Sequence, residues 1–183
     1  QLSDRTIVWV TPSLPARIGN AVLSYSAYLF QAVWPARLSA LYPYPAAGIP
    51  LDTVAGSAVF LIGFTSLVWR WRSTLPFLAV GWCWYLGTLV PVIGLVQVGA
   101  QARADRYAYL PLVGIFILLA WLAGDLARRR KSMQTGLGAA SLAVLGALGA
   151  CSSLQTSRWR DSVTLNEHSA LVTKDNYIVL NNL

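Results

Sequence analysis

Four long apolar runs, separated by short polar connectors, dominate the chain after its first 51 residues. Each run approaches the ~20 helical residues that cross the roughly 30 Å hydrocarbon core of a membrane. Pro91 lies inside the second run, where the loss of one backbone hydrogen bond predicts a kink. The pattern predicts an all-α, polytopic transmembrane helix bundle within residues 52–154, with spans at about 52–68, 74–96, 110–127 and 135–154.

A different pattern occupies residues 1–51, where an amphipathic helix is predicted over residues 16–34 and ended by Pro35. One face carries polar or small residues at intervals of four, three and four: Asn20, Ser24, Ala27 and Gln31. Such a helix can lie in the membrane interface, or it can span the membrane with this face turned into a bundle. We favour an interfacial or re-entrant position, because no charge in residues 1–15 requires that segment to be cytoplasmic.

Small residues recur every four positions in the last apolar run, at Ala139, Ala143, Ala147 and Cys151. This spacing favours the close approach of a neighbouring helix. The chain then changes character. Residues 155–183 are polar, with apolar side chains at helical intervals and a turn near Asn176, and they predict the start of a soluble helical repeat on one side of the membrane.

The composition supports the membrane class and excludes others. Only 11% of the residues are charged, against about 25% in soluble domains. The net charge of +7 does not indicate nucleic acid, because the basic residues gather at the ends of apolar runs rather than in a basic stripe. Two cysteines at different expected depths and one histidine form no metal-ligand set, so no metal or cofactor is predicted.

Basic residues in two connectors predict the orientation. Arg70 and Arg72 follow the first span, and residues 128–131 follow the third. Two spans separate these connectors, so both lie on the same side, which the positive-inside rule makes cytoplasmic. The connector of residues 97–109, the segment of residues 1–51 and the tail of residues 155–183 then face outward.

The candidate chemistry lies in the outward connector, where Arg103, Asp105 and Arg106 stand with Tyr107 and Tyr109 between two apolar runs. Guanidinium groups match phosphate oxygens, so the cluster could hold an anionic headgroup. It could equally serve only to anchor the helix ends at the interface. Two other polar residues receive simpler interpretations: Asp125 as an ion-pair partner of the neighbouring bases, and His168 as a solvated surface side chain.

Four segments in the same order resemble a known family. Residues Asp105-Arg-Tyr-Ala-Tyr-Leu-Pro-Leu-Val-Gly114 resemble the motif Asp/Glu-Arg-Tyr-x-Tyr-Leu-Pro-Ser-x-Gly. That motif occurs in the transmembrane and tetratricopeptide-repeat-containing O-mannosyltransferases and their bacterial relatives. Three further segments are similar to that family: Arg17-Ile-Gly-Asn-Ala-Val-Leu-Ser-Tyr25, Trp34-Pro-Ala-Arg-Leu-Ser-Ala-Leu-Tyr-Pro-Tyr-Pro45 and Trp159-Arg-Asp-Ser-Val-Thr-Leu-Asn-Glu-His168.

This resemblance implies a membrane-embedded, C-type glycosyltransferase of a bacterial inner membrane. Such an enzyme moves a sugar from a polyprenyl-phosphate carrier to a protein or other acceptor on the periplasmic face, and its repeats bind the acceptor or a partner protein. The chain would then be an internal fragment, with the catalytic acidic residue upstream of Gln1. Asp105, Arg106, Tyr107 and Tyr109 would line the substrate site, and Arg103 joins them by its position. The alternative is a non-enzymatic membrane anchor that displays a repeat scaffold.

Overall fold

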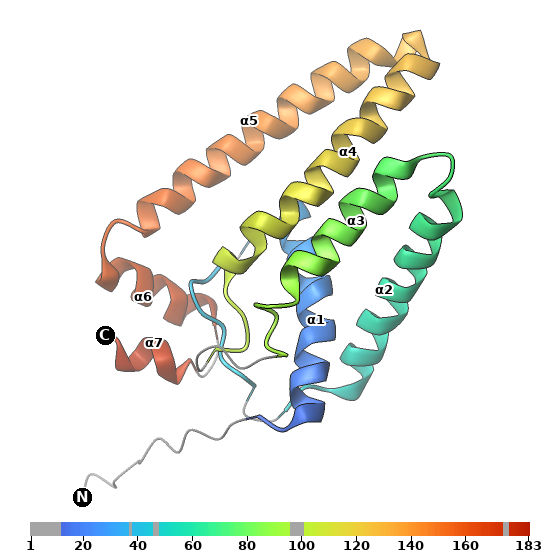
Figure 1. The fold of residues 1–183 in the computed structure, drawn as a ribbon. Coiled ribbons are helices and arrows are strands. Elements are labelled where there is room, and N and C mark those ends of the chain that lie inside the picture. Colours follow the sequence, from blue (N-terminus) through green and yellow to red (C-terminus); the bar gives the residue numbers. More distant parts are fainter. Residues whose placement is uncertain (1–11, 37, 46–47, 96–100, 174–175) are drawn as a thin grey trace, which may run out of the picture.

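The computed structural model describes residues 12–36, 38–45, 48–95, 101–173 and 176–183, and the fold is all-α (Figure 1). Three helices are long and apolar enough to cross a membrane, consistent with a multi-pass membrane protein. They are α2 (Leu51–Trp71), α4 (Tyr109–Arg129) with the preceding 3-10 turn η1 (Asp105–Ala108), and α5 (Gln134–Arg158). The remaining helices are α1 (Leu14–Val33), α3 (Pro76–Leu89), η2 (Lys131–Met133), α6 (Ser162–Val172) and α7 (Tyr177–Asn181).

The expectation of a transmembrane helix over residues 74–96 is wrong in its extent. The helix α3 has 14 residues, which is about 21 Å of helix against the roughly 30 Å of a hydrocarbon core. It ends at Leu89, shortly before Pro91, and the chain then passes through turns to Gly94, which has a φ of 90°. Pro91 therefore lies beyond the helix rather than at a kink within it, and a left-handed glycine follows.

The helix α1 turns its polar face into the protein. Asn20 and Ser24 of that face are buried, whereas Ile18 and Val33 on the opposite face are exposed. A helix lying on a membrane surface would place its polar face in water, so this orientation matches the bundle alternative more closely. α1 is nevertheless not among the three helices whose length and apolarity suit a membrane span.

The tightest helix contact joins α3 to α4 at two glycines. A Cβ atom added to Gly81 would lie 2.5 Å from the Gly114 carbonyl oxygen, and one added to Gly114 would lie 2.5 Å from the Gly81 oxygen. The two backbones therefore touch directly, as small residues permit between membrane helices. Around this contact the core is aromatic, with Trp82 and Tyr85 of α3 stacked at 5.4 Å between ring centroids.

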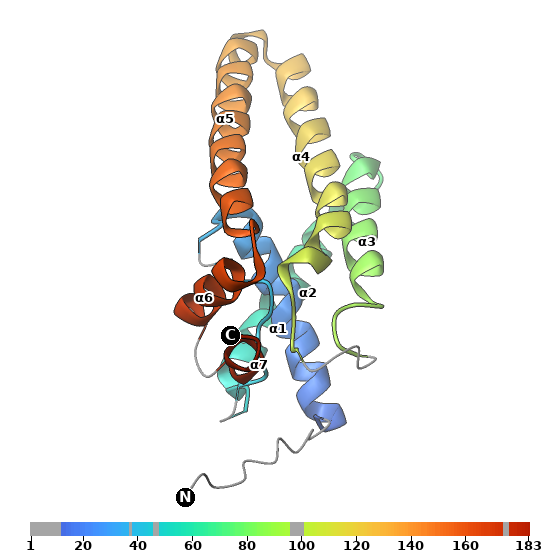
Figure 2. The same ribbon diagram turned by 90° about the vertical axis from the view of Figure 1, so that its left-hand side faces the viewer.

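The helix α5 stands apart from this core. None of its residues is buried, although α5 is joined to α4 through η2 at one end (Figure 2). The face of small residues predicted to meet a neighbouring helix is exposed at all four positions, Ala139, Ala143, Ala147 and Cys151. In the part of the chain that the structure describes, this predicted contact has no helical partner.

The connectors lie at the two ends of the bundle in the grouping that the sequence predicts. The basic α2–α3 and α4–α5 connections lie at one end, and the connector before η1 and the tail helices α6 and α7 lie at the other (Figure 1). Both tail helices begin with a side-chain cap. Asp161 accepts a hydrogen bond from the Thr164 amide, and Asn176 accepts one from the Val179 amide, which satisfies donors that a helix start leaves free.

Candidate functional site

Two connectors that are distant in the sequence pair with each other at the end of the bundle opposite the basic loops. The Tyr42 amide donates to the Arg103 carbonyl at 2.9 Å, and the Ala102 amide donates to the Tyr42 carbonyl at 2.8 Å. These bonds form an isolated antiparallel bridge between residues 42 and 103. The pairing fixes the approach of the chain to η1, and with it the position of Asp105.

Polar side chains of α1 hydrogen-bond to the backbone on both sides of residue 103 in this bridge. The Asn20 amide nitrogen donates to the Ala102 carbonyl at 2.8 Å, and the Tyr28 hydroxyl donates to the Ala104 carbonyl at 3.0 Å. Both side chains are buried. The inward polar face of α1 therefore satisfies backbone groups that the irregular connector could not pair by itself.

Asp105 is the centre of the arrangement. Its Oδ2 atom accepts a hydrogen bond from the Ser39 amide at 2.7 Å and one from the Tyr42 hydroxyl at 3.2 Å. Its Oδ1 atom is buried and has no hydrogen-bond partner in the described part of the chain. A carboxylate oxygen held in this way is a strong acceptor with free capacity for an incoming donor.

Tyr42 links the carboxylate to α1. Its hydroxyl accepts hydrogen bonds from the Gln31 amide nitrogen at 2.8 Å and from the Ser39 amide at 3.0 Å. Burial and then the neighbouring charge of Asp105 raise the pKa of Tyr42 well above its ordinary value. The phenol therefore keeps its proton, and it can donate that proton to the Asp105 carboxylate throughout the physiological range.

Arg103 completes what we call the connector cluster, which consists of Gln31, Ser39, Tyr42, Arg103 and Asp105. The Arg103 guanidinium carbon lies 4.4 Å from the centre of the Tyr42 ring, within the range of a cation–π contact. The side chain is half-buried. A guanidinium stacked in this way retains its fork of N–H donors for an anion.

The structure does not bring all five predicted site residues into this cluster. Arg103 and Asp105 belong to it. Arg106 is exposed, with its guanidinium carbon 5.2 Å from the centre of the Tyr107 ring, and the Tyr107 hydroxyl accepts a hydrogen bond from Gln101 at 2.8 Å. Tyr109 is 68% exposed at the start of α4.

Tyr109 instead lines a groove between the start of α4 and the end of α5. The groove has a volume of about 300 Å³. Its lining residues are Pro35, Leu38, Tyr109, Leu148, Cys151, Ser152, Leu154, Gln155 and Arg158. The only charged group among them is Arg158. Because Leu38 precedes the Ser39 amide that binds Asp105, the groove adjoins the connector cluster.

His168 is less solvated than the sequence suggested. It is half-buried, and its Nε2 atom lies 2.9 Å from an Arg158 guanidinium nitrogen. Burial and then the charge of Arg158 lower the pKa of His168, and a hydrogen bond to the Leu38 backbone opposes part of that effect. A neutral ring that accepts from Arg158 and donates to Leu38 accounts for this environment.

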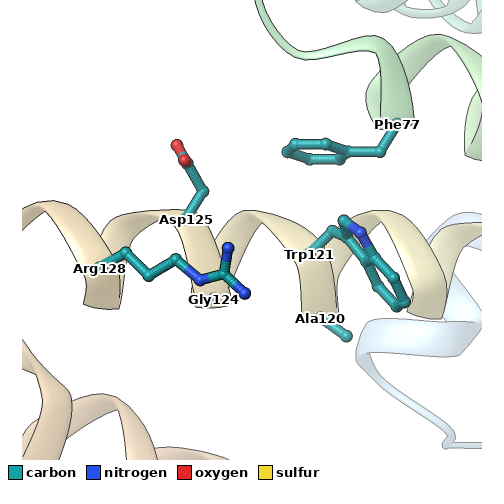
Figure 3. A pocket seen from close by; sticks show the side chains of 6 residues that line it. All are labelled: Phe77, Ala120, Trp121, Gly124, Asp125 and Arg128. Atoms are coloured by element: carbon teal, nitrogen blue, oxygen red, sulfur yellow. The ribbon is translucent and has the colours of Figure 1, made fainter.

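A second hollow, at the basic end of the bundle, is not a comparable site. It measures about 430 Å³ and lies between Phe77 of α3 and the end of α4, where Trp121, Asp125 and Arg128 line it (Figure 3). Asp125 Oδ2 accepts a hydrogen bond from Arg129 Nε at 2.7 Å. This bond confirms the predicted local ion pair, and the carboxylate is engaged by it.

Sequence reasoning missed Ser39, Gln31 and Tyr28 as parts of the site. Tyr42 and Ser39 both lie in the segment of residues 34–45 that resembles the family, but nothing in the sequence marked Ser39, whose backbone amide makes the contact. In the described residues, no group of three or more His, Cys, Asp or Glu side chains could hold a metal ion. Comparisons of the chain with protein-family models, curated proteins and solved structures found no match.

Proposed function

We propose that this chain is part of an integral-membrane glycosyltransferase that moves a sugar from a polyprenyl-phosphate carrier to a protein or other acceptor on the periplasmic face. The resemblance of residues 105–114 to the motif of the repeat-containing mannosyltransferases supports this assignment. The connector cluster is the proposed contact for the carrier's head. The catalytic acidic residue is not assigned to any residue of this chain.

One observation carries the proposal: a polar cluster with an unpartnered carboxylate oxygen adjoins an apolar groove between two candidate membrane helices. An amphiphile with an anionic head and an apolar tail matches both parts. Its phosphate would accept hydrogen bonds from Arg103 and Arg106, and its tail would bury apolar surface along the groove.

The two kinds of charged group would have separate tasks. Arg103 and Arg106 would stabilise the negative charge on the departing phosphate, which grows as the sugar bond breaks. Asp105 Oδ1 would accept a hydrogen bond from a sugar hydroxyl and fix the orientation of the sugar. Its other oxygen is already occupied by Ser39 and Tyr42, so the carboxylate is held in place before the substrate arrives.

The alternative is a non-enzymatic anchor that displays a repeat scaffold. It is favoured by the position of α6 and α7, which lie at the same end of the bundle as the connector cluster and contact residue 41 through Asn176 (Figure 1). It gives no reason for a buried carboxylate oxygen without a partner. We therefore place it second.

The test is sugar transfer by the full-length protein in membranes that contain labelled polyprenyl-phosphate sugar. Arg106→Ala and Asp105→Asn should each reduce transfer about tenfold or more, because a hydrogen bond to a charged group contributes about 1.5–3 kcal/mol. Asp105→Asn keeps one oxygen to accept from Ser39, so the connector remains paired.

Arg72→Ala is the matched control, since Arg72 is an exposed arginine that stacks on Trp69 at the basic end of the bundle. Its activity should equal that of the unmodified protein. Transfer that survives Asp105→Asn would remove the cluster from the site, and transfer that survives Arg106→Ala would remove Arg106 from it. Absence of transfer by the unmodified protein, across several sugars and acceptors, would favour the anchor.

A further inference from the structure

The soluble tail contacts the connector that holds Asp105. The Asn176 side-chain nitrogen donates to the Leu41 carbonyl at 3.0 Å, across a separation of 135 residues. Asn176 is 2% exposed, so this contact is removed from water.

The side-chain amide of Asn176 both donates and accepts hydrogen bonds. Its nitrogen donates to Leu41 and also to the Thr173 hydroxyl at 2.9 Å, and its oxygen accepts from the Val179 amide at 3.3 Å. The two donors of the amide are therefore both engaged. An aspartate at this position could still cap α7, but it could not donate to Leu41.

The Leu41 carbonyl connects Asn176 to the carboxylate. It also accepts a hydrogen bond from the Ser39 hydroxyl at 2.9 Å. The amide of the same Ser39 donates to Asp105 Oδ2. Three consecutive contacts thus lead from the tail to the cluster: Asn176 to Leu41, Leu41 to Ser39, and Ser39 to Asp105.

We infer that Asn176 is a positioning residue of the connector cluster. It holds the Leu41 carbonyl where Ser39 can bind it, and Ser39 in turn holds Asp105. Undocking of α6 and α7 therefore loosens the donors around the carboxylate, and any protein that engages these helices acts on the cluster through them. The structural link stands without the proposed function, and only its effect on a carrier ligand rests on that function.

A simpler role for Asn176 is that of a helix cap for α7 alone. Asn176→Asp separates the two roles, because Asp caps helices about as well as Asn and lacks the donor for Leu41. Asn182→Asp makes the same chemical change at an exposed position in the same segment, so it controls for added charge.

The first measurement is amide hydrogen exchange in the full-length protein in lipid nanodiscs. In Asn176→Asp, exchange of the Ser39 and Tyr42 amides should rise about tenfold or more, while amides of α3 remain as protected as in the unmodified protein. Asn182→Asp should change neither. Unchanged exchange at Ser39 would overturn the inference and leave Asn176 as a cap.

A double-substitution cycle covers the case in which Asn176→Asp destabilises the whole protein. If Asn176 acts through the connector, the double variant should lose less Tm than the sum of the losses from Asn176→Asp and Asp105→Ala alone. Fully additive losses would show that the tail and the cluster are independent, and the inference would fail.

Binding of a polyprenyl phosphate in the same nanodiscs separates this inference from the proposed function. Asn176→Asp should weaken binding several-fold, although Asn176 lies outside the cluster. Faster exchange at Ser39 with no binding even by the unmodified protein would overturn the proposed function and keep the positioning role. Intact binding in a variant whose Ser39 amide exchanges quickly would overturn the effect on the ligand.

Discussion

The helices α3 and α5 are both apolar, yet α3 is partly buried within the protein and α5 is not. α3 has 14 residues and buries five of them, which are Leu78, Gly81, Trp82, Tyr85 and Leu89. α5 has 25 residues and buries none. Hydrophobicity therefore predicts that both leave water, but it does not predict whether protein or lipid surrounds them.

The difference follows from the shapes of the side chains. α3 combines bulky aromatic rings with a glycine, so it fills space on one side and lets α4 approach closely at Gly81. α5 carries no aromatic residue, and its glycines, such as Gly146, have open space around them. Matched substitutions in the two helices test this difference.

The largest expected difference comes from adding a side chain at a glycine. Gly81→Val would place Cβ 2.5 Å from the Gly114 oxygen and 2.8 Å from Leu118 Cβ, so the helices must separate. We expect a loss of about 3 kcal/mol or more from overpacking, measured by thermal unfolding in detergent. Gly146→Val makes the same change with no atom within 4 Å. Equal losses for both would refute the comparison.

A smaller difference is expected when leucine is cut to alanine. Leu89 is 0% exposed and Leu145 is 66% exposed. Leu89→Ala should cost about 2–5 kcal/mol, because it removes buried methyl groups and leaves a cavity. Leu145→Ala should remain within about 0.5 kcal/mol of the unmodified protein. Denaturant titrations in one detergent give both values, and a large loss for Leu145→Ala would mean that protein covers α5.

Removal of one hydroxyl should have an effect of about 1 kcal/mol in α3 and less in α5. The Tyr85 hydroxyl donates to the Tyr25 carbonyl at 2.6 Å, so Tyr85→Phe removes a hydrogen bond between α3 and α1. The Thr156 hydroxyl donates to the Ser152 carbonyl of its own exposed helix turn. Thermal unfolding should therefore respond more to Tyr85→Phe than to Thr156→Val, and the reverse order would contradict the burial.

The weakest response that we expect is a pH dependence of α6, where His168 meets Arg158 at the end of α5. The pKa of His168 is lowered, so the docked tail favours the neutral ring, and the resulting stability is present above the ordinary pKa near 6.5. It is lost as the pH falls through the folded pKa, because a second positive charge then forms beside Arg158. Exchange of α6 amides, corrected for intrinsic rates, should accelerate in acid relative to α3. His168→Gln should abolish this dependence, and its persistence there would assign it to another group.

The sequence predicts the helices better than their contacts. The runs expected at 52–68 and 110–127 correspond to Leu51–Trp71 and Tyr109–Arg129, because a long apolar segment between charged ends has few other conformations in a membrane. The run at 74–96 was predicted too long, since Pro91 was expected to bend the helix, whereas the helix ends before it.

The candidate site was only partly predictable for a related reason. The charges at Arg103 and Asp105 are visible as polar residues between apolar runs. Their partners are backbone groups of Ser39 and Leu41 and side chains of α1, and a backbone group carries no signal in the sequence. The tail's attachment through Asn176 is likewise a contact between distant segments, which no local pattern indicates.

The link between Tyr42 and Asp105 has a consequence for biogenesis. It joins residues 63 positions apart, and both α2 and α3 lie between them. During synthesis, the earlier connector emerges well before its partner and must wait for that helical hairpin to enter the membrane. A chain that inserts the hairpin wrongly keeps the polar groups of Ser39, Tyr42 and Asn20 unsatisfied. Closure of this loop therefore depends on correct placement of the hairpin, and without it these polar groups lack the partners that they have in the folded chain.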